Sequence, residues 1–211
     1  GQIRAVMDDI KPRAVKVGMV NDIDTINAIA DTLAEYDVEN LVVDPVMVAT
    51  SGSRLMQDDA VDVFTKKLLP MASLLTPNVP EAEVLAGIPI NDKESMEKAA
   101  HIIHSKGCKA LLIKGGHIEG RKIDRLYTAM GMEREYEAAN VATRNTHGTG
   151  CTLSSAITSY LAMGYAIGEA IAAAKEWLTG ALIAGANVEI GSGHGPVNHF
   201  YNPQKTIIKT K

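Results

Sequence analysis

The stretch Arg144–Ser154, RNTHGTGCTLS, is the part of the sequence from which the fold and the chemistry are most directly inferred. Its glycines and threonines stand at the predicted start of a helix, where the N–H groups of Gly148, Thr149 and Gly150 can stay open and the dipole favours an anion. The same field favours the thiolate form of Cys151. An anion cradle beside a proton acceptor is suited to phosphoryl transfer. The alternative is a glycine-rich helix entry with a small buried cysteine.

Short apolar runs of the β type alternate with longer helical runs along the chain. We predict strands at 14–18, 41–44, 73–76 and 110–114, and a hairpin formed by 125–130 and 134–139 around Gly131. We predict helices ending at residue 10 and covering 22–35, 58–69, 78–86, 92–105, 150–163 and 167–186, with an irregular tail after Gly191. This alternation predicts an α/β fold with a mostly parallel sheet and helices on its faces. The length of 211 residues predicts a single domain over 1–211.

Composition excludes several classes of function. The chain is 46% hydrophobic and 22% charged, and its net charge of −4 gives no reason to expect a nucleic acid partner. No apolar run reaches the ~18 residues of a membrane span, so we expect no membrane insertion. The two cysteines, Cys108 and Cys151, lack paired spacing and fit a reducing cytoplasm.

Polar residues follow the predicted strands, and parallel strands bring such residues to one edge of the sheet. Asp44, before a proline, can hold magnesium through water, or can simply form a turn. Asn78 and Glu81 are spaced i, i+3 at a helix start and can hold a hydrated magnesium and a polyphosphate, or can form a capping box. Lys114 precedes two glycines and can bind a phosphate beside their exposed backbone. Alternatively, it lies at an exposed strand end.

Two further residues have simple alternatives. Lys175, within the helix at 167–186, can reach a nucleotide or can lie on a solvated helix face. His147 can contact a substrate or can be an ordinary loop histidine. The sequence contains no GxxxxGK[ST], GxSxG or strand-linked GxGxxG motif, so phosphate binding must use another scaffold.

Six motifs in unbroken order resemble the hydroxymethylpyrimidine and phosphomethylpyrimidine kinases of thiamine biosynthesis, which belong to the ribokinase-like superfamily. The resemblance extends from about residue 3 to about residue 199. The motifs are VKVGMV (15–20), VVDPVMVATSG (42–52), LLTPNVPEAEVLAG (74–87), LLIKGGH (111–117), TRNTHGTGCTLSSAI (143–157) and GHGPVNH (193–199).

The resemblance implies a three-layer α/β sandwich and two ATP- and Mg²⁺-dependent steps. These steps phosphorylate 4-amino-5-hydroxymethyl-2-methylpyrimidine and then its monophosphate. It also implies a homodimer.

By the same resemblance, Cys151 is the general base, in a position where the superfamily often has an aspartate. The amides of Gly148, Thr149 and Gly150 stabilise the transferred phosphoryl group. The remaining implied roles are magnesium-side for Asp44 and Glu81, phosphate-side for Asn78, Glu81, Lys114 and Thr149, nucleotide-side for Lys175, and pyrimidine-pocket lining for Met19 and Val46.

Two other functions fit parts of this pattern. A pyridoxal kinase of the same superfamily also phosphorylates a hydroxymethyl group on a heteroaromatic ring, although HGTGC and GHGPVNH favour the pyrimidine branch. A non-catalytic module would bind a pyrimidine phosphate and leave ATP intact. The joint presence of Glu81, Lys114 and Cys151 argues against such a module.

Compared with the family pattern, the chain starts part-way through the fold. The family's first strand, its GSD-type segment and several pyrimidine-binding residues have no counterpart after Gly1. We therefore expect an exposed apolar sheet edge, which favours pairing or aggregation.

We predict that this 211-residue chain is weakly active or inactive as a kinase, because much of the family's substrate site has no counterpart in it. A coupled ATP-turnover assay, run beside a longer parent that carries the GSD-type segment, checks this. Full activity of the chain alone would refute the prediction.

Overall fold

The computed structural model describes residues 1–47, 55–116 and 123–205. Six strands form one sheet in the spatial order β1 to β6, and β1 to β4 are parallel while β5 and β6 are antiparallel additions. The strands are β1 (Val15–Val17), β2 (Leu41–Val43), β3 (Leu74–Leu75), β4 (Ala110–Gly116), β5 (Ile123–Thr128) and β6 (Gly131–Glu137).

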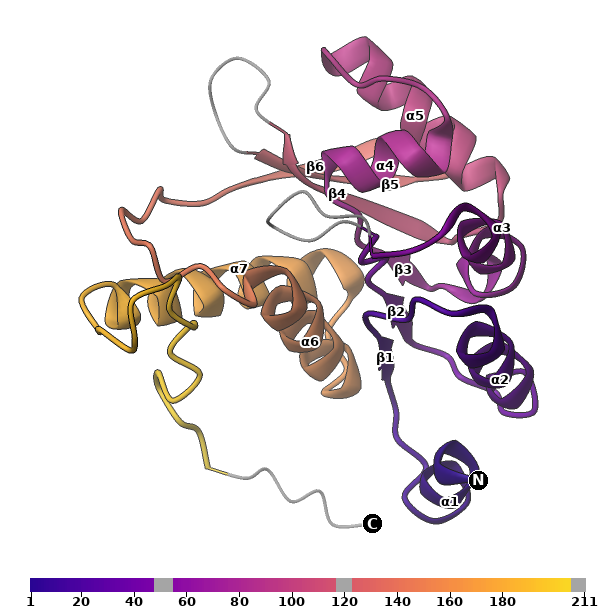
Figure 1. The fold of residues 1–211 in the computed structure, drawn as a ribbon, viewed down its shortest axis with the longest axis horizontal. Coiled ribbons are helices and arrows are strands. Elements are labelled where there is room, and N and C mark those ends of the chain that lie inside the picture. The colour runs from indigo at the N-terminus through magenta and orange to yellow at the C-terminus, as the bar shows by residue number, and fades with distance from the viewer. Residues whose placement is uncertain (48–54, 117–122, 206–211) are drawn as a thin grey trace.

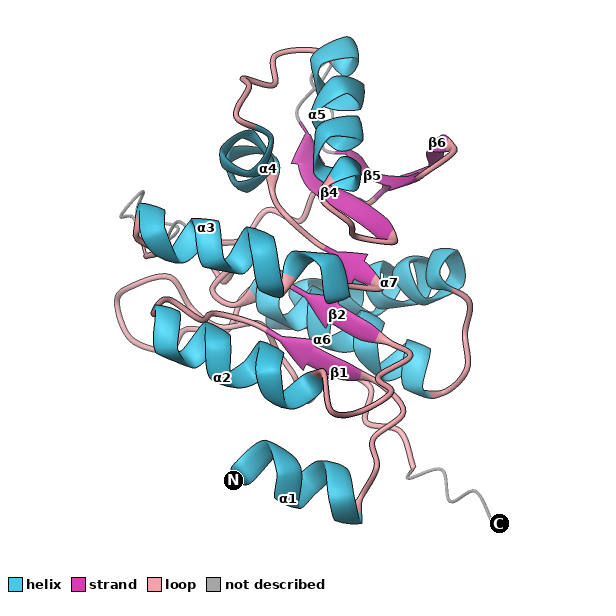
Figure 2. Cartoon of the chain, turned by 90° about the vertical axis from the view of Figure 1, so that its right-hand side faces the viewer, coloured by secondary structure: helices cyan, strands magenta, loops and turns pink. Residues whose placement is uncertain are grey.

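Helices cover both faces of this sheet and give a three-layer arrangement (Figures 1 and 2). Helices α2 to α5 lie on one face, and α6 and α7 lie on the other. The helices are α1 (Gln2–Asp9), α2 (Ile23–Leu33), α3 (Asp58–Lys67), α4 (Val79–Ala86), α5 (Lys93–Ser105), α6 (Thr149–Ala162) and α7 (Ile167–Gly185), with a 3₁₀ turn at Leu69–Met71.

The central strands are apolar on both sides because each face is covered by helices. Successive residues of a strand point to opposite faces. Accordingly, Val43 packs into the core under α2 to α5, whereas its neighbour Val42 packs into the core under α6 and α7. Leu111 and Leu112 divide between the two cores in the same way. Both cores therefore hold the carboxyl ends of the strands in fixed positions.

The predicted element order is confirmed, with the boundaries shifted by a few residues. The hairpin turns at residues 129 and 130, so Gly131 is the first residue of β6 with φ of 107° and does not form the turn itself. After Gly191 the described chain, to residue 205, contains no helix or strand. The family-like residues 48–52 and His117, together with 206–211, lie outside the described residues.

The described part of the chain contains no helix that is both long enough and apolar enough to cross a membrane. Strand β1 ends the order of described strands, and Val15 and Lys16 in it are partly exposed.

Candidate active site

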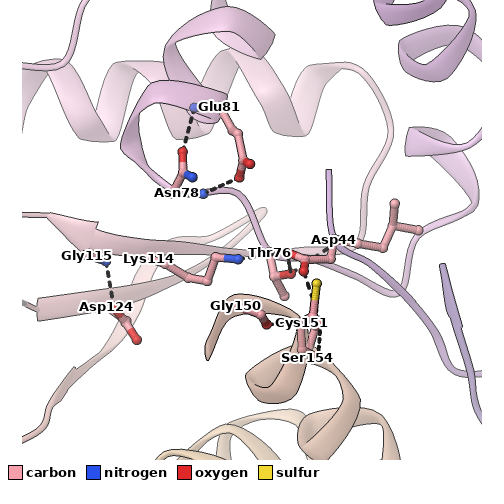
Figure 3. Close-up of polar contacts among 11 residues, drawn as sticks. Asp44, Thr76, Asn78, Glu81, Lys114, Gly115, Asp124, Gly150, Cys151 and Ser154 are labelled. Atoms are coloured by element: carbon pink, nitrogen blue, oxygen red, sulfur yellow. Dashed lines mark hydrogen bonds and ion pairs between the residues drawn. The ribbon is translucent and has the colours of Figure 1, made fainter. Parts of the chain in front are cut away.

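The buried carboxylate of Asp44 connects four elements at the carboxyl end of the sheet (Figure 3). Asp44 follows β2 and is 1% exposed. Its Oδ1 accepts hydrogen bonds from the Thr76 hydroxyl at 2.9 Å, beyond β3, and from the Lys114 ammonium at 2.7 Å, in β4. Its Oδ2 accepts from the Ser154 hydroxyl of α6 at 3.1 Å. The strand ends and the start of α6 are thus held around one negative charge.

The first turn of α6 offers unpaired amides to this site. Gly148 is the N-cap with φ of 83°, in the left-handed region that glycine tolerates, and no side chain caps the helix. The Thr149 N–H donates to the Thr146 carbonyl at 3.3 Å. Gly148, Gly150 and Cys151 have no backbone acceptor for their N–H groups among the described residues. The N–H groups predicted to stay open are therefore open at Gly148 and Gly150 but not at Thr149, and Cys151 adds one that was not predicted. Binding of an anion by these amides remains a prediction.

Lys114 brings a positive charge to the same turn. Its side chain is 14% exposed, and a Cβ added at Gly150 would lie 3.6 Å from its Nζ atom. The ammonium therefore lies between the Asp44 carboxylate and the first turn of α6. The alternative of an exposed strand end is wrong for this lysine. A lysine beside open amides is an arrangement that binds phosphate.

Asn78 and Glu81 form the capping box of α4. The Asn78 side chain accepts from the Glu81 N–H, and the Glu81 carboxylate accepts from the Asn78 N–H, both at 2.8 Å. Glu81 is nonetheless 3% exposed. Burial raises the pKa of the Glu81 carboxyl, and the nearby negative charge of Asp44 adds to this effect, while the Asn78 backbone and Lys114 oppose it. The capping interpretation is confirmed, and it keeps this carboxylate in the electrostatic field of Asp44.

The two carboxylates fit a hydrated magnesium ion. Mg²⁺ in phosphate-transfer sites is usually held by one or two carboxylates together with water and substrate phosphates. Asp44 and Glu81 are both buried and repel each other, with Lys114 as the cation that acts on both. A divalent cation would relieve that repulsion. The described residues contain no group of three or more His, Cys, Asp or Glu side chains that would bind a metal without the substrate.

Cys151 is exposed in the first turn of α6, unlike the buried Cys108. The turn is fixed by Ser154, whose hydroxyl lies 3.1 Å from the Cys151 carbonyl and 3.2 Å from that of Gly150. In Figure 3 the sulfur is directed toward the strand ends rather than into packed hydrocarbon. Cys151 also borders a cavity of about 500 Å³ that Trp177 and His199 help to line. The thiol is therefore accessible and adjacent to the anion cradle.

Lys175 is held close to the same edge of the sheet. Its ammonium lies 2.5 Å from the Asp124 Oδ2 atom, and the Asp124 Oδ1 atom accepts from the Gly115 N–H at 2.7 Å. The lysine side chain is 13% exposed, so the expectation of a solvated helix-face lysine is wrong. Lys175 is thus linked through Asp124 to Gly115, the residue after Lys114. Its binding of a nucleotide remains a prediction.

Met19 and Val46 follow the neighbouring parallel strands β1 and β2, paired as Val17 with Val43. Both therefore lie at the edge of the sheet that carries Asp44. Met19 is 59% exposed, and Val46 is half-buried. These exposures leave apolar surface at this edge. Their predicted role in lining a pyrimidine pocket remains a prediction.

Three residues of this site, Thr76, Ser154 and Asp124, were not predicted to belong to it. Thr76 ends a predicted strand, and Ser154 lies three residues after Cys151 on the same helix face, so spacing alone offered a weak indication of each. Asp124 belongs to no motif, and only the pairing of β4 with β5 places it beside Gly115. His147, considered for substrate contact, is exposed and donates its backbone N–H to the Gly195 carbonyl at 3.1 Å.

We predict that Glu81→Gln becomes more stable relative to the wild type as the pH rises. Because the pKa of Glu81 is raised by folding, its stabilising contribution is complete below the unfolded value of about pH 4 and is lost as the pH rises through the folded value. Glutamine keeps an acceptor for the Asn78 N–H and never ionises. Denaturant unfolding at pH 4 and pH 8 measures the difference.

Glu97→Gln, at an exposed position of α5, is the matched control and should show no such change. A difference between Glu81→Gln and the wild type that is constant or shrinks from pH 4 to pH 8 would contradict this account of Glu81.

Known proteins that are similar to this chain belong to one family of kinases. The model of the phosphomethylpyrimidine kinase family matches residues 1–198. A hydroxymethylpyrimidine/phosphomethylpyrimidine kinase from Rhizobium meliloti is 45% identical, with 95% of this chain and 75% of that protein covered. The thiamine biosynthesis bifunctional protein ThiED from Geobacter sulfurreducens is 46% identical over 94% of this chain, which spans 40% of that longer protein.

Solved structures agree with this assignment. The phosphomethylpyrimidine kinase of Clostridium difficile superposes with a TM-score of 0.75 at 43% identity, over 84% of this chain and 72% of that one. The ADP complex of Bacillus subtilis pyridoxal kinase superposes with a TM-score of 0.84 at 33% identity, over 95% and 75%. The ribokinase-like sandwich inferred from the six motifs is thereby confirmed. The chain belongs to the phosphomethylpyrimidine kinase family, a family of phosphotransferases.

Proposed function

We propose that this site transfers the γ-phosphoryl group of ATP to the hydroxymethyl group of 4-amino-5-hydroxymethyl-2-methylpyrimidine, and then to the resulting monophosphate. Membership of the family supports the reaction class. The observation that carries the proposal is the position of the Cys151 thiol beside the open amides of α6 and the Lys114 ammonium. These groups provide a proton acceptor and an anion cradle at one point.

The proposed chemistry follows from these positions. Cys151, as thiolate, takes the proton of the substrate hydroxyl while that oxygen bonds to the γ-phosphorus. The bond from the γ-phosphorus to the bridging oxygen breaks, and ADP leaves with the electron pair. The open amides of Gly148, Gly150 and Cys151, together with Lys114, stabilise the charge on the phosphoryl oxygens, and the Thr149 amide lies beside them.

The remaining positions complete the proposal. Asp44 and Glu81 would hold Mg²⁺ through water, and the ion would neutralise phosphate charge. Asn78 and Lys175 would face the nucleotide phosphates, and Met19 and Val46 would contact the pyrimidine ring. We further propose that the chain works as a homodimer in the cytoplasm, where a free thiol such as Cys151 stays reduced.

Cys151 is tested by three substitutions. Cys151→Ala should lower phosphoryl transfer by ~10²-fold or more, because a general base is lost. Cys151→Asp should recover part of the rate, since a carboxylate replaces the thiolate as base. Cys108→Ala, at the buried cysteine, is the matched control and should keep the wild-type rate. The measurement is a single-turnover assay with enzyme in excess and labelled ATP, which follows the transfer step itself. Equal rates for wild type and Cys151→Ala would exclude Cys151 as the base.

Pyridoxal phosphorylation is the second candidate, favoured by the TM-score of 0.84 against the Bacillus subtilis pyridoxal kinase. Both activities use the same phosphate site, so the site geometry alone does not separate them. An assay with both hydroxymethyl compounds competing for limiting ATP compares their kcat/KM directly. We expect the pyrimidine product to dominate, and a dominant pyridoxal phosphate product would reverse the assignment.

A further inference from the structure

The GHGPVNH motif lies outside the phosphate site, yet the structure places it against the loop that leads into α6. We define Gly193–His199 as the C-terminal strap and Arg144–Gly148 as the loop before α6. The two segments are parallel at the bridge between His147 and Pro196. The His147 N–H donates to the Gly195 carbonyl at 3.1 Å. The strap is therefore joined to the loop through its backbone.

Side chains fix both ends of this contact. His194 Nδ1 lies 3.1 Å from the Arg144 carbonyl oxygen at the beginning of the loop. His199 Nε2 lies 2.9 Å from the Thr152 hydroxyl, within the first turn of α6. Thr152 is 8% exposed and directly follows Cys151. The strap thus spans the whole length from the start of the loop to the residue beside the thiol.

Gly195 fits closely against the side chain of Asn145. A Cβ added at Gly195 would lie 2.1 Å from the Asn145 Oδ1 atom. Asn145 is 4% exposed, and its Nδ2 atom donates to the carbonyls of Gly185 and Val188, each at 2.7 Å. Because these two bonds hold the amide in place, the asparagine has no free direction in which to move. A side chain at position 195 would displace the loop instead.

We infer that the C-terminal strap is a positioning element for phosphoryl transfer, which acts through Gly195 on the loop and through His199 on Thr152. Neither residue is required to touch the substrate. Their contacts fix the turn that carries the Gly150 and Cys151 amides and the thiol. Displacement of reacting groups by about 1 Å can cost about 10²-fold in rate. The inference rests on the proposed function of Cys151, and it assigns a task to a motif that the phosphate site itself does not use.

Two matched pairs of variants test the strap. Gly195→Ala is compared with Gly193→Ala, because a Cβ at Gly193 would meet nothing within 4 Å. His199→Ala is compared with His199→Gln, because the glutamine amide can still form a hydrogen bond with the Thr152 hydroxyl from the position of Nε2. The readouts are kcat, KM for ATP, the melting temperature, and the rate at which iodoacetamide modifies Cys151, measured by mass spectrometry of its peptide.

We expect Gly195→Ala and His199→Ala to lower kcat by about 10-fold or more and to change the Cys151 alkylation rate, because both displace the reacting groups. Gly193→Ala and His199→Gln should stay near the wild type in both readouts, and KM for ATP should change less than kcat. If Gly195→Ala does not fold, the comparison of His199→Ala with His199→Gln still tests whether the strap positions the reacting groups. A His199→Gln variant as slow as His199→Ala, or wild-type kcat and alkylation rates in His199→Ala, would overturn the inference.

The alkylation rate separates this inference from the proposed function. If neither this chain nor a longer parent that carries the GSD-type segment transfers a phosphoryl group, the proposed function fails, whereas the comparison of alkylation rates among the four variants still tests the strap. Cys108 is buried, and burial raises the pKa of its thiol to about 11, so its peptide serves as the unreactive internal reference.

Discussion

The buried Asp44 carboxylate holds the ends of three parallel strands and the start of α6 together. An ionised carboxylate removed from water is strongly unfavourable unless hydrogen bonds and an opposite charge surround it. Here Thr76, Lys114 and Ser154 supply them, from three elements other than the strand that precedes Asp44. Each donor has to reach the same point, so the charge fixes the relative position of β2, β3, β4 and the start of α6.

The chemistry follows from that fixed position. Because Ser154 lies one turn after Gly150, its bond to Asp44 orients the open amides and the Cys151 thiol toward the strand ends. Lys114 serves both the Asp44 carboxylate and the anion cradle. The strap holds the same turn from the other direction, at Thr152. Two independent sets of contacts therefore constrain the turn that carries the open amides and the Cys151 thiol.

The order of helices and strands could be predicted from the sequence, because periodicity and turn residues are local properties. Parallel strands bring the residues that follow them to one edge of the sheet, and this correctly placed Asp44, Asn78 and Lys114 together. It did not yield the bond between Asp44 and Ser154, whose residues are 110 positions apart, since pairing over that separation depends on how α6 packs on the sheet. The burial of Lys175 could not be predicted for a similar reason, because its partner Asp124 lies in a strand that carries no motif.

The sequence left two roles open for Asn78 and Glu81, capping a helix or binding a ligand. In the structure they cap α4, and Glu81 still lies close enough to Asp44 for the two charges to interact.

A double-mutant cycle between Asp44 and Ser154 measures whether the buried carboxylate holds α6 on the sheet. The free energies of unfolding of wild type, Asp44→Asn, Ser154→Ala and the double variant give the coupling between the two side chains. A hydrogen bond to a charged group is typically worth about 1.5–3 kcal/mol, so we predict a coupling of about that size. The pair of Asp44 with Ser159, an exposed serine of the same helix, should give a coupling near zero. Additive effects of Asp44→Asn and Ser154→Ala would show that the buried carboxylate does not hold α6 and would contradict the account.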